Sequence, residues 1–167
     1  MQTKADGTIV LSWSAPARPL DAGDAIRSVH NQHEHIRVLL QRAMATAEAT
    51  LDGDSPRPQT AAVIEELRAT MEGHLTYEER VLLPLLRSDP PLGPQRAENL
   101  LAEHRHQRQM LAAIHHEAQL YPRLATLSAK LSFLARWLLA DMEEEERSLL
   151  SPEVVREDVV VVDQTCS

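Results

Sequence analysis

The chain has 167 residues, a formal net charge of −8, 43% hydrophobic residues and only 3% aromatic residues. This length fits one domain with a single sizeable core, and the acidic charge argues against a nucleic-acid-binding surface, which needs a basic face. No apolar run reaches the ~18–20 residues of a membrane-spanning helix, and residues 1–7 contain no signal-peptide core. The single cysteine, Cys166, excludes an internal disulfide and a cysteine-rich zinc site. We therefore expect a cytoplasmic protein with no nucleic-acid partner and no membrane partner.

Residues 1–23 are predicted to form an N-terminal arm. The segment from Thr8 to Trp13 is short and apolar, and prolines at positions 16 and 19 follow it. We expect this arm to pack over the domain that comes next.

Four segments, residues 24–51, 59–87, 95–120 and 122–150, are predicted to be helices. Helix-forming Ala, Leu, Glu, Arg and Gln dominate them, and the Pro and Gly residues between them stop one helix and suit the first turn of the next. Each segment carries one apolar stripe at helical spacing, such as Leu127, Leu131 and Leu134 in the fourth. The sequence therefore predicts an all-α protein, an up-down-up-down antiparallel four-helix bundle over residues 24–150.

Residues 151–167 are predicted to form a C-terminal tail. Four consecutive valines, 159–162, fit a strand-like arm, an oligomer contact or a disordered segment, and the sequence leaves these alternatives open. A homodimer is among the oligomeric states that the sequence allows.

Ionisable residues interrupt all four apolar stripes at positions that should face the core. A buried charge or imidazole costs several kcal/mol unless it is paired or binds a metal ion. The offsets of these residues from the helix ends place them in one layer of an antiparallel bundle. A shared metal site explains the four interruptions together, and a structural polar network is the alternative. The residues are His33 in the first helix, His74 and Glu78 in the second, His104 in the third, and Asp141 and Glu145 in the fourth.

The residue types at these positions favour a transition metal. Imidazole nitrogens combined with carboxylates suit iron, manganese or zinc. His74 and Glu78 lie one turn apart on one helix face, and Glu78 and Glu145, on two helices, can bridge two metal ions. Five or six candidate ligands exceed the three or four protein ligands of a mononuclear zinc site. The pattern therefore predicts a dinuclear site in the bundle core.

Motifs on all four helices resemble those of the hemerythrin family, including its bacterial HHE cation-binding branch. They are similar to the family's Q-H-x-x-L, H-x-x-x-E-E, E-H and W-L-x-x-H patterns, in that order, and the resemblance covers about residues 8–150. The stretches are Gln32-His33-x-x-Ile36, His74-x-x-x-Glu78-Glu79, Glu103-His104, and Trp137-Leu-Leu-Ala-Asp141 followed by Glu143 to Glu146.

The resemblance implies a non-haem di-iron centre with terminal histidines and two bridging carboxylates; zinc and manganese are the alternatives to iron. Members of the family bind or sense dioxygen, handle nitric oxide or peroxide, or store iron. The implied partner is therefore a small diatomic molecule or peroxide, and a binding protein is favoured over a peroxide-consuming enzyme. By motif match, the metal ligands are His33, His74, Glu78, His104, Asp141 and Glu145.

Two positions depart from the family pattern. Arg108 stands where the third helix often carries a second histidine, and Asp141 replaces the histidine of the fourth. Aspartate also ligates iron, so the centre can persist with more oxygen ligands, whereas Arg108 beside a metal is repulsive unless a carboxylate pairs with it. The second bridging carboxylate is Glu145 or Glu146, and His30, one turn before the first-helix ligand, is an alternative nitrogen donor.

A rival interpretation is a degenerate bundle that holds one metal ion or none and acts as a sensor or protein-interaction module. The metal content of the purified protein separates it from the di-iron interpretation. Four further histidines fall mostly off the stripes and are expected to face solvent: His35, His106, His115 and His116.

Overall fold

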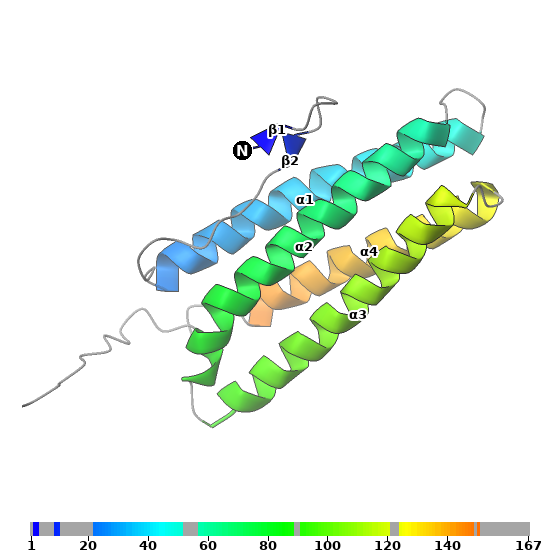
Figure 1. Ribbon diagram of the computed structural model, residues 1–167. Helices are drawn as coiled ribbons and strands as arrows, with labels where there is room; N and C mark the ends of the chain where they lie inside the picture. Colours follow the sequence, from blue (N-terminus) through cyan, green and yellow to red (C-terminus); the bar gives the residue numbers. More distant parts are fainter. Residues whose placement is uncertain are drawn as a thin grey trace, which may run out of the picture.

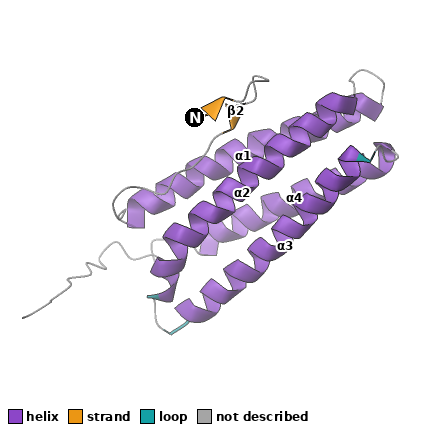
Figure 2. Cartoon of the chain, in the orientation of Figure 1, coloured by secondary structure: helices purple, strands orange, loops and turns teal. Residues whose placement is uncertain are grey.

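A computed structural model of the chain describes residues 2–3, 9–10, 22–51, 57–88, 91–120, 124–148 and 150. Four helices account for nearly all of them: α1 (Ala22–Leu51), α2 (Arg57–Arg87), α3 (Gly93–Gln119) and α4 (Leu124–Ser148) (Figures 1 and 2). The predicted all-α fold class is confirmed, and each helix begins and ends within two residues of the predicted bounds. No helix in these ranges is both long and apolar enough to cross a membrane.

The four helices form an antiparallel bundle in which each helix has two neighbours. α1 packs against α2 and α4, and α3 packs against the same two helices. Consecutive helices run in opposite directions, as Figure 1 shows. α3 and α4 make the fewest contacts with each other of the four neighbouring pairs, so this seam is the loosest in the bundle.

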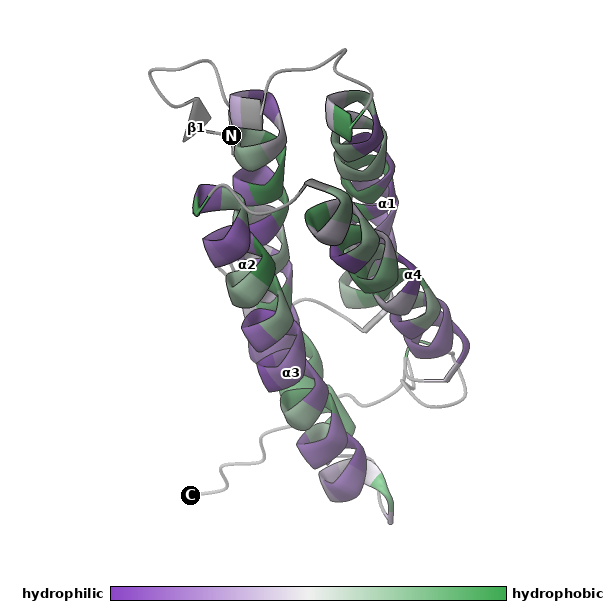
Figure 3. Cartoon of the chain, turned by 90° about the vertical axis from the view of Figure 1, so that its right-hand side faces the viewer, coloured by the Kyte–Doolittle hydropathy of each residue, from purple (hydrophilic) through white to green (hydrophobic). Residues whose placement is uncertain are grey.

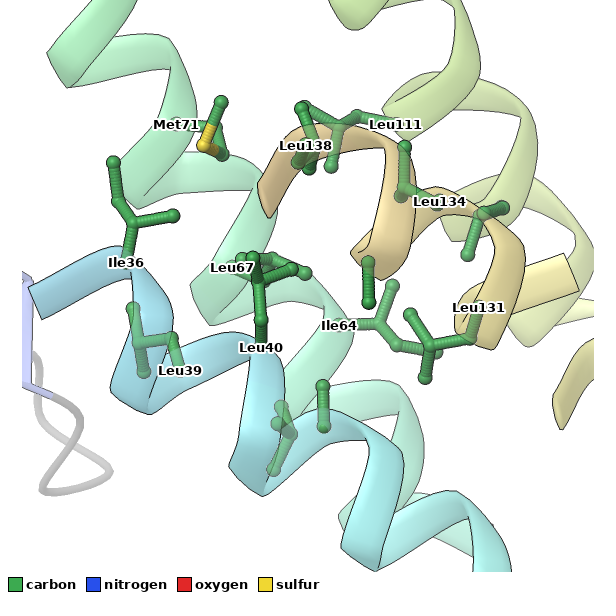
Figure 4. Close-up of a cluster of buried hydrophobic side chains, with 14 of the residues drawn as sticks. Ile36, Leu39, Leu40, Ile64, Leu67, Met71, Leu111, Leu131, Leu134 and Leu138 are labelled. Atoms are coloured by element: carbon green, nitrogen blue, oxygen red, sulfur yellow. The ribbon is translucent and has the colours of Figure 1, made fainter. Parts of the chain in front are cut away.

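The apolar stripes predicted from the sequence form the bundle core. Every helix carries both hydrophobic and hydrophilic residues (Figure 3), and its buried hydrophobic residues recur at the spacing of a single face. The largest apolar cluster draws on all four helices and fills one half of the bundle (Figure 4). Its members drawn and labelled in Figure 4 are Ile36, Leu39, Leu40, Ile64, Leu67, Met71, Leu111, Leu131, Leu134 and Leu138.

Truncating a residue of this cluster tests the bundle core. Leu40 has no exposed surface, so Leu40→Ala removes packed methyl groups and leaves a cavity. We expect the free energy of unfolding to fall by about 2–5 kcal/mol. Val38 on the same helix is 60% exposed, and Val38→Ala is expected to change it by less than about 0.5 kcal/mol. Urea unfolding followed by circular dichroism measures both variants, and equal losses would contradict this assignment of the buried face.

The junction between α2 and α3 requires a glycine. A Cβ atom at Gly93, the first residue of α3, would overlap the main-chain carbonyl group of Leu86. A larger residue would therefore push α3 away from the end of α2. This close approach helps to set the position of α3 along α2. It therefore affects how His104 of α3 lies relative to Glu78 of α2.

Only small parts of the predicted arm lie within the described residues. Strands β1 (Gln2–Thr3) and β2 (Ile9–Val10) pair antiparallel, with Gln2 opposite Val10, and β2 contacts α2. Residues 22 and 23 of the predicted arm belong to α1, and its remaining residues lie outside the described ones. The whole predicted tail, with its valines 159–162 and Cys166, also lies outside the described residues.

Candidate metal centre

A polar layer crosses the bundle between two apolar regions. On α1, buried His33 lies between Val29, which belongs to one apolar cluster, and Ile36, which belongs to another. On α2 and α3 the polar residues likewise lie between members of two apolar clusters, so hydrophobic side chains enclose the layer on both sides along the bundle axis. The candidate ligands in this layer are His33 from α1, His74 and Glu78 from α2, His104 from α3, and Asp141 and Glu145 from α4.

Glu78 lies at the centre of the buried cluster. Its Oε1 atom lies 3.5 Å from Nε2 of His74 and 3.8 Å from Nε2 of His33, and its Oε2 atom lies 3.1 Å from Nε2 of His104. Glu145 Oε2 lies 3.5 Å from the same nitrogen of His33. Each of these five residues is at most 5% exposed. One ligating atom from each of His33, His74, Glu78 and Glu145 lies within 4.8 Å of the other three, which is the spacing of a set that could hold a metal ion.

Several polar atoms of this cluster make no hydrogen bond within the described part of the chain. They are Nε2 of His33, Nε2 of His104 and both carboxylate oxygens of Glu78. Buried polar atoms left without a hydrogen bond are costly and rare in folded proteins. Because these are nitrogen and oxygen donors that face one another, the residues present fit a bound transition-metal cation.

The second ring nitrogen of each cluster histidine is held by an acceptor outside the cluster. Nδ1 of His74 donates to Oε1 of Gln32 at 3.0 Å, and the amide orientation is fixed because Nε2 of Gln32 donates to Oγ of Ser28. Nδ1 of His33 lies 2.8 Å from Glu146 and that of His104 lies 3.1 Å from Glu79.

These acceptors determine which ring nitrogen faces the cluster. A carboxylate and an amide oxygen can only accept, so each Nδ1 carries the proton and each Nε2 is turned toward the cluster. This is the arrangement in which histidines bind metal ions in proteins.

The two departures from the family pattern have structural explanations. Arg108 pairs with Glu79 at 2.6 Å and with Glu72 at 3.0 Å, so carboxylates balance its charge. Asp141 is half-buried at the edge of the cluster and accepts a hydrogen bond from Nε2 of Gln107. Burial, together with the nearby carboxylates of Glu103 and Glu78, raises the pKa of Asp141 to about 6. Asp141 is thus an aspartate at the rim of the cluster, not within the four-residue group.

The two alternative ligands lie at the periphery. Glu146 bonds to Nδ1 of His33, the ring nitrogen that faces away from the cluster, and to Arg37. His30 is 44% exposed and its Nδ1 lies 3.6 Å from Glu146. The geometry therefore places Glu145, and not Glu146, among the inward-facing groups.

Charges within the cluster are strongly coupled. Burial disfavours the charged form of His33, but the carboxylates of Glu145 and Glu78 outweigh it and raise the pKa of His33 to about 10. Burial and the charge of Glu78 raise the pKa of Glu145 to about 8. Burial lowers the pKa of His74 to about 4. Burial opposes ionisation of Glu78, but the surrounding histidines prevail and lower its pKa.

A small acidic pocket opens beside the cluster between α3 and α4. Its volume is about 200 Å³, and buried Glu145 lies in its wall with half-buried Asp141. It therefore reaches the cluster along the loosest seam of the bundle. The other lining residues are Arg96, Asn99, Leu100, Glu103, Glu144 and Ser148.

The remaining histidines lie outside the cluster. His106 and His116 are exposed, as predicted, and the ring of His106 packs edge-on against Trp137. His35 and His115 are half-buried instead of solvent-facing, and Nε2 of His115 lies 3.0 Å from Glu65. None of the four belongs to the group of potential metal ligands found among the described residues.

The family model of the hemerythrin HHE cation-binding domain matches residues 24–151, which span the whole bundle. The chain belongs to this family. Membership agrees with the histidine and carboxylate cluster and indicates that the hemerythrin-like bundle binds a cation. Neither the curated proteins nor the solved structures include a significant match to the chain.

Among the outer partners of the histidines, only Glu146 was predicted as a functional residue, as an alternative bridging carboxylate and not as a partner of His33. Gln32 and Glu79 belong to the motifs of the family, but their contacts with His74 and His104 depend on side-chain positions. Arg37, the partner of Glu146, was not predicted either, although it follows His33 by four residues and so lies one turn along the same helix face. That spacing is the one signal in the sequence that could have found it.

Proposed function

We propose that this hemerythrin-like bundle holds a dinuclear non-haem iron centre and uses it to bind or sense a small molecule such as dioxygen, nitric oxide or peroxide, or to hold iron. His33, His74, His104, Glu78 and Glu145 would be the ligands from the buried cluster. Asp141 would complete the set from the rim. The iron pair would supply redox chemistry and coordination positions that no side chain in the cluster provides.

The observation that carries this proposal is the convergence of Nε2 atoms on one buried carboxylate. Within the described part of the chain, neither oxygen of Glu78 makes a hydrogen bond, and the two oxygens lie near the Nε2 atoms of three histidines on three helices. A carboxylate with both oxygens available in this way would suit a pair of cations. Glu145 supports a second bridge because it approaches the cluster from the fourth helix.

The surroundings of the cluster favour small neutral molecules or cations over anions. Apolar clusters enclose the polar layer on both sides along the bundle axis, and the pocket between α3 and α4 approaches it from the side. The pocket beside it is lined by four carboxyl groups and one arginine, and a cleft of one charge sign repels ions of the same sign. Dioxygen, nitric oxide, hydrogen peroxide and ferrous iron are compatible with this field.

Elemental analysis of the purified protein tests the proposal. About two iron ions per chain after aerobic purification, with a ligand-to-metal charge-transfer band in the near ultraviolet, is the expected result. Less than about 0.2 transition-metal ions per chain, both as isolated and after incubation with ferrous iron, would overturn it. That outcome would favour the degenerate bundle, which acts as a sensor or interaction module. Peroxide consumption that disappears in His74→Ala would instead indicate a di-iron enzyme.

A further inference from the structure

Two of the three cluster histidines are connected to an arginine through a glutamate. In the first relay, Nδ1 of His33 lies 2.8 Å from Glu146, and Nη2 of Arg37 lies 2.9 Å from both oxygens of the same carboxylate. Because Arg37 and Glu146 come from α1 and α4, this relay spans one seam of the bundle.

The second relay repeats this arrangement across the opposite seam. Nδ1 of His104 lies 3.1 Å from Oε1 of Glu79, and Nη1 of Arg108 lies 2.6 Å from the same oxygen. Nε of Arg108 also donates to Glu72 at 3.0 Å, which holds the guanidinium group in place. His104 and Arg108 come from α3, whereas Glu79 comes from α2.

Both relays follow one sequence rule. The arginine stands four residues after its histidine, at 33 and 37 and at 104 and 108. Each outer glutamate directly follows a cluster carboxylate, in the pairs 78–79 and 145–146. The first glutamate of each pair therefore faces the cluster, and the second contacts Nδ1 of a cluster histidine from outside the cluster.

The third histidine, His74, is held differently at its outer nitrogen. Its Nδ1 donates to Gln32, whose amide is neutral. A carboxylate acceptor draws the Nδ1 proton and makes the imidazole a stronger electron donor, whereas an amide does so weakly. The structure thus gives His33 and His104 a carboxylate acceptor at Nδ1, whereas Nδ1 of His74 donates to an amide oxygen.

The arginines limit how much each carboxylate strengthens its histidine as an electron donor. The side chains of Arg37, Glu146, Arg108 and Glu79 are only 21–29% exposed, so water screens these pairs less than it screens surface pairs. Each arginine donates to the same carboxylate oxygen that the histidine contacts, so it shares the negative charge of that glutamate and keeps the glutamate ionised. The pKa of Glu79 and that of Glu146 lie below the usual value, since pairing with arginine and histidine outweighs their burial.

We propose that Arg37 and Arg108 are positioning residues that act through Glu146 and Glu79 to set the donor strength of His33 and His104, and thereby the reduction potential of the bound metal. The inference rests on the proposed function, because it requires a redox-active metal in the cluster. Neither arginine touches the cluster itself, so each acts at a distance through its glutamate.

Opposite substitutions in the second relay test this inference in the full-length protein loaded with ferrous iron without oxygen. Glu79→Gln removes a negative charge and leaves the arginine, so the ferric state is disfavoured and the midpoint potential rises. Arg108→Gln removes the positive charge, and the potential falls. A tenfold change in the ratio of ferric to ferrous affinity is expected in each case, which equals ~59 mV for a one-electron couple. Glu79→Gln is also expected to weaken iron binding by about 10–100-fold.

Two further variants separate tuning from structural damage. Arg108→Lys keeps the positive charge, so its midpoint potential is expected to lie close to that of the wild type. Arg42→Gln breaks an ion pair with Glu66 that also joins two helices. Arg42 lies nine residues after His33 on α1, so this variant is expected to leave the midpoint potential of the metal unchanged. Shifts of the same sign in Glu79→Gln and Arg108→Gln, or no shift in either, would overturn the inference. A wild-type protein that takes up no iron would instead overturn the proposed function.

Discussion

Replacing Glu78 with glutamine is expected to reduce the metal affinity of the protein by more than about 100-fold. Loss of an outer partner of a metal ligand costs about 10–100-fold, and Glu78 is the carboxylate that three histidine nitrogens approach directly. Glutamine keeps the shape but carries no charge, and its amide nitrogen cannot accept a metal ion. It would also turn N–H groups toward histidine nitrogens in a site with no exposure to water.

Metal content by elemental analysis and the dissociation constant for ferrous iron measure this effect. Glu66→Gln is the matched control, because Glu66 lies three turns earlier on α2 and pairs with Arg42 at a distance from the cluster. Circular dichroism of both variants shows whether the bundle remains helical. A Glu78→Gln protein that folds and retains the metal content and affinity of the wild type would remove Glu78 from the ligand set.

The metal-free protein is expected to lose stability as the pH rises from 6.5 to 8.5. The folded-state pKa of His33 is about 10 against 6.5 for the ordinary imidazole. Its contribution to stability is therefore complete below pH 6.5 and is lost as the pH rises toward 10. Glu145, with a pKa of about 8 instead of 4.5, acts in the same direction between those values. His74 has little effect between pH 6.5 and 8.5, because its lowered pKa reduces the stability of the folded protein only below pH 6.5.

One pKa unit corresponds to about 1.4 kcal/mol, so His33 and Glu145 each lose about 2 kcal/mol over this window, or about 4 kcal/mol together. For a chain of this size the combined loss lowers Tm by about 8–16 °C. Metal binding has the opposite dependence on pH: it becomes stronger as the pH rises, because protons must leave His33 and Glu145 before their atoms can bind a cation. The difference in Tm between metal-loaded and metal-free protein should therefore grow with pH.

Thermal unfolding with a chelator and with excess metal, at several pH values, tests this behaviour. Glu145→Gln, which cannot ionise, is expected to flatten the slope of the metal-free protein. A metal-free Tm that is constant or rises between pH 6.5 and 8.5 would show that the buried histidine and carboxylate do not hold these protons.

The sequence alone determined the fold and the membership of the polar layer. A helix buries a residue every three to four positions, so the stripe that contains Leu127, Leu131 and Leu134 already defines the inward face of α4. Residues such as His33 and Glu78 take positions in the apolar stripes of their own helices, so helical periodicity is sufficient to predict that they are buried in the core. Loop lengths then require consecutive helices to be antiparallel.

Only the tertiary structure decided which atoms meet. Periodicity gives the face of a residue but not its height to within an ångström or its rotamer, and contacts between Glu145 and His33 or between Glu146 and His33 depend on both. The adjacent residues Glu145 and Glu146 differ by one helix position, or 100° around the axis, which turns one toward the cluster and the other to its outside. For the same reason Arg108 could be recognised in the sequence as a charge in need of a partner, whereas its contact with Glu79 arises from the packing of α3 against α2.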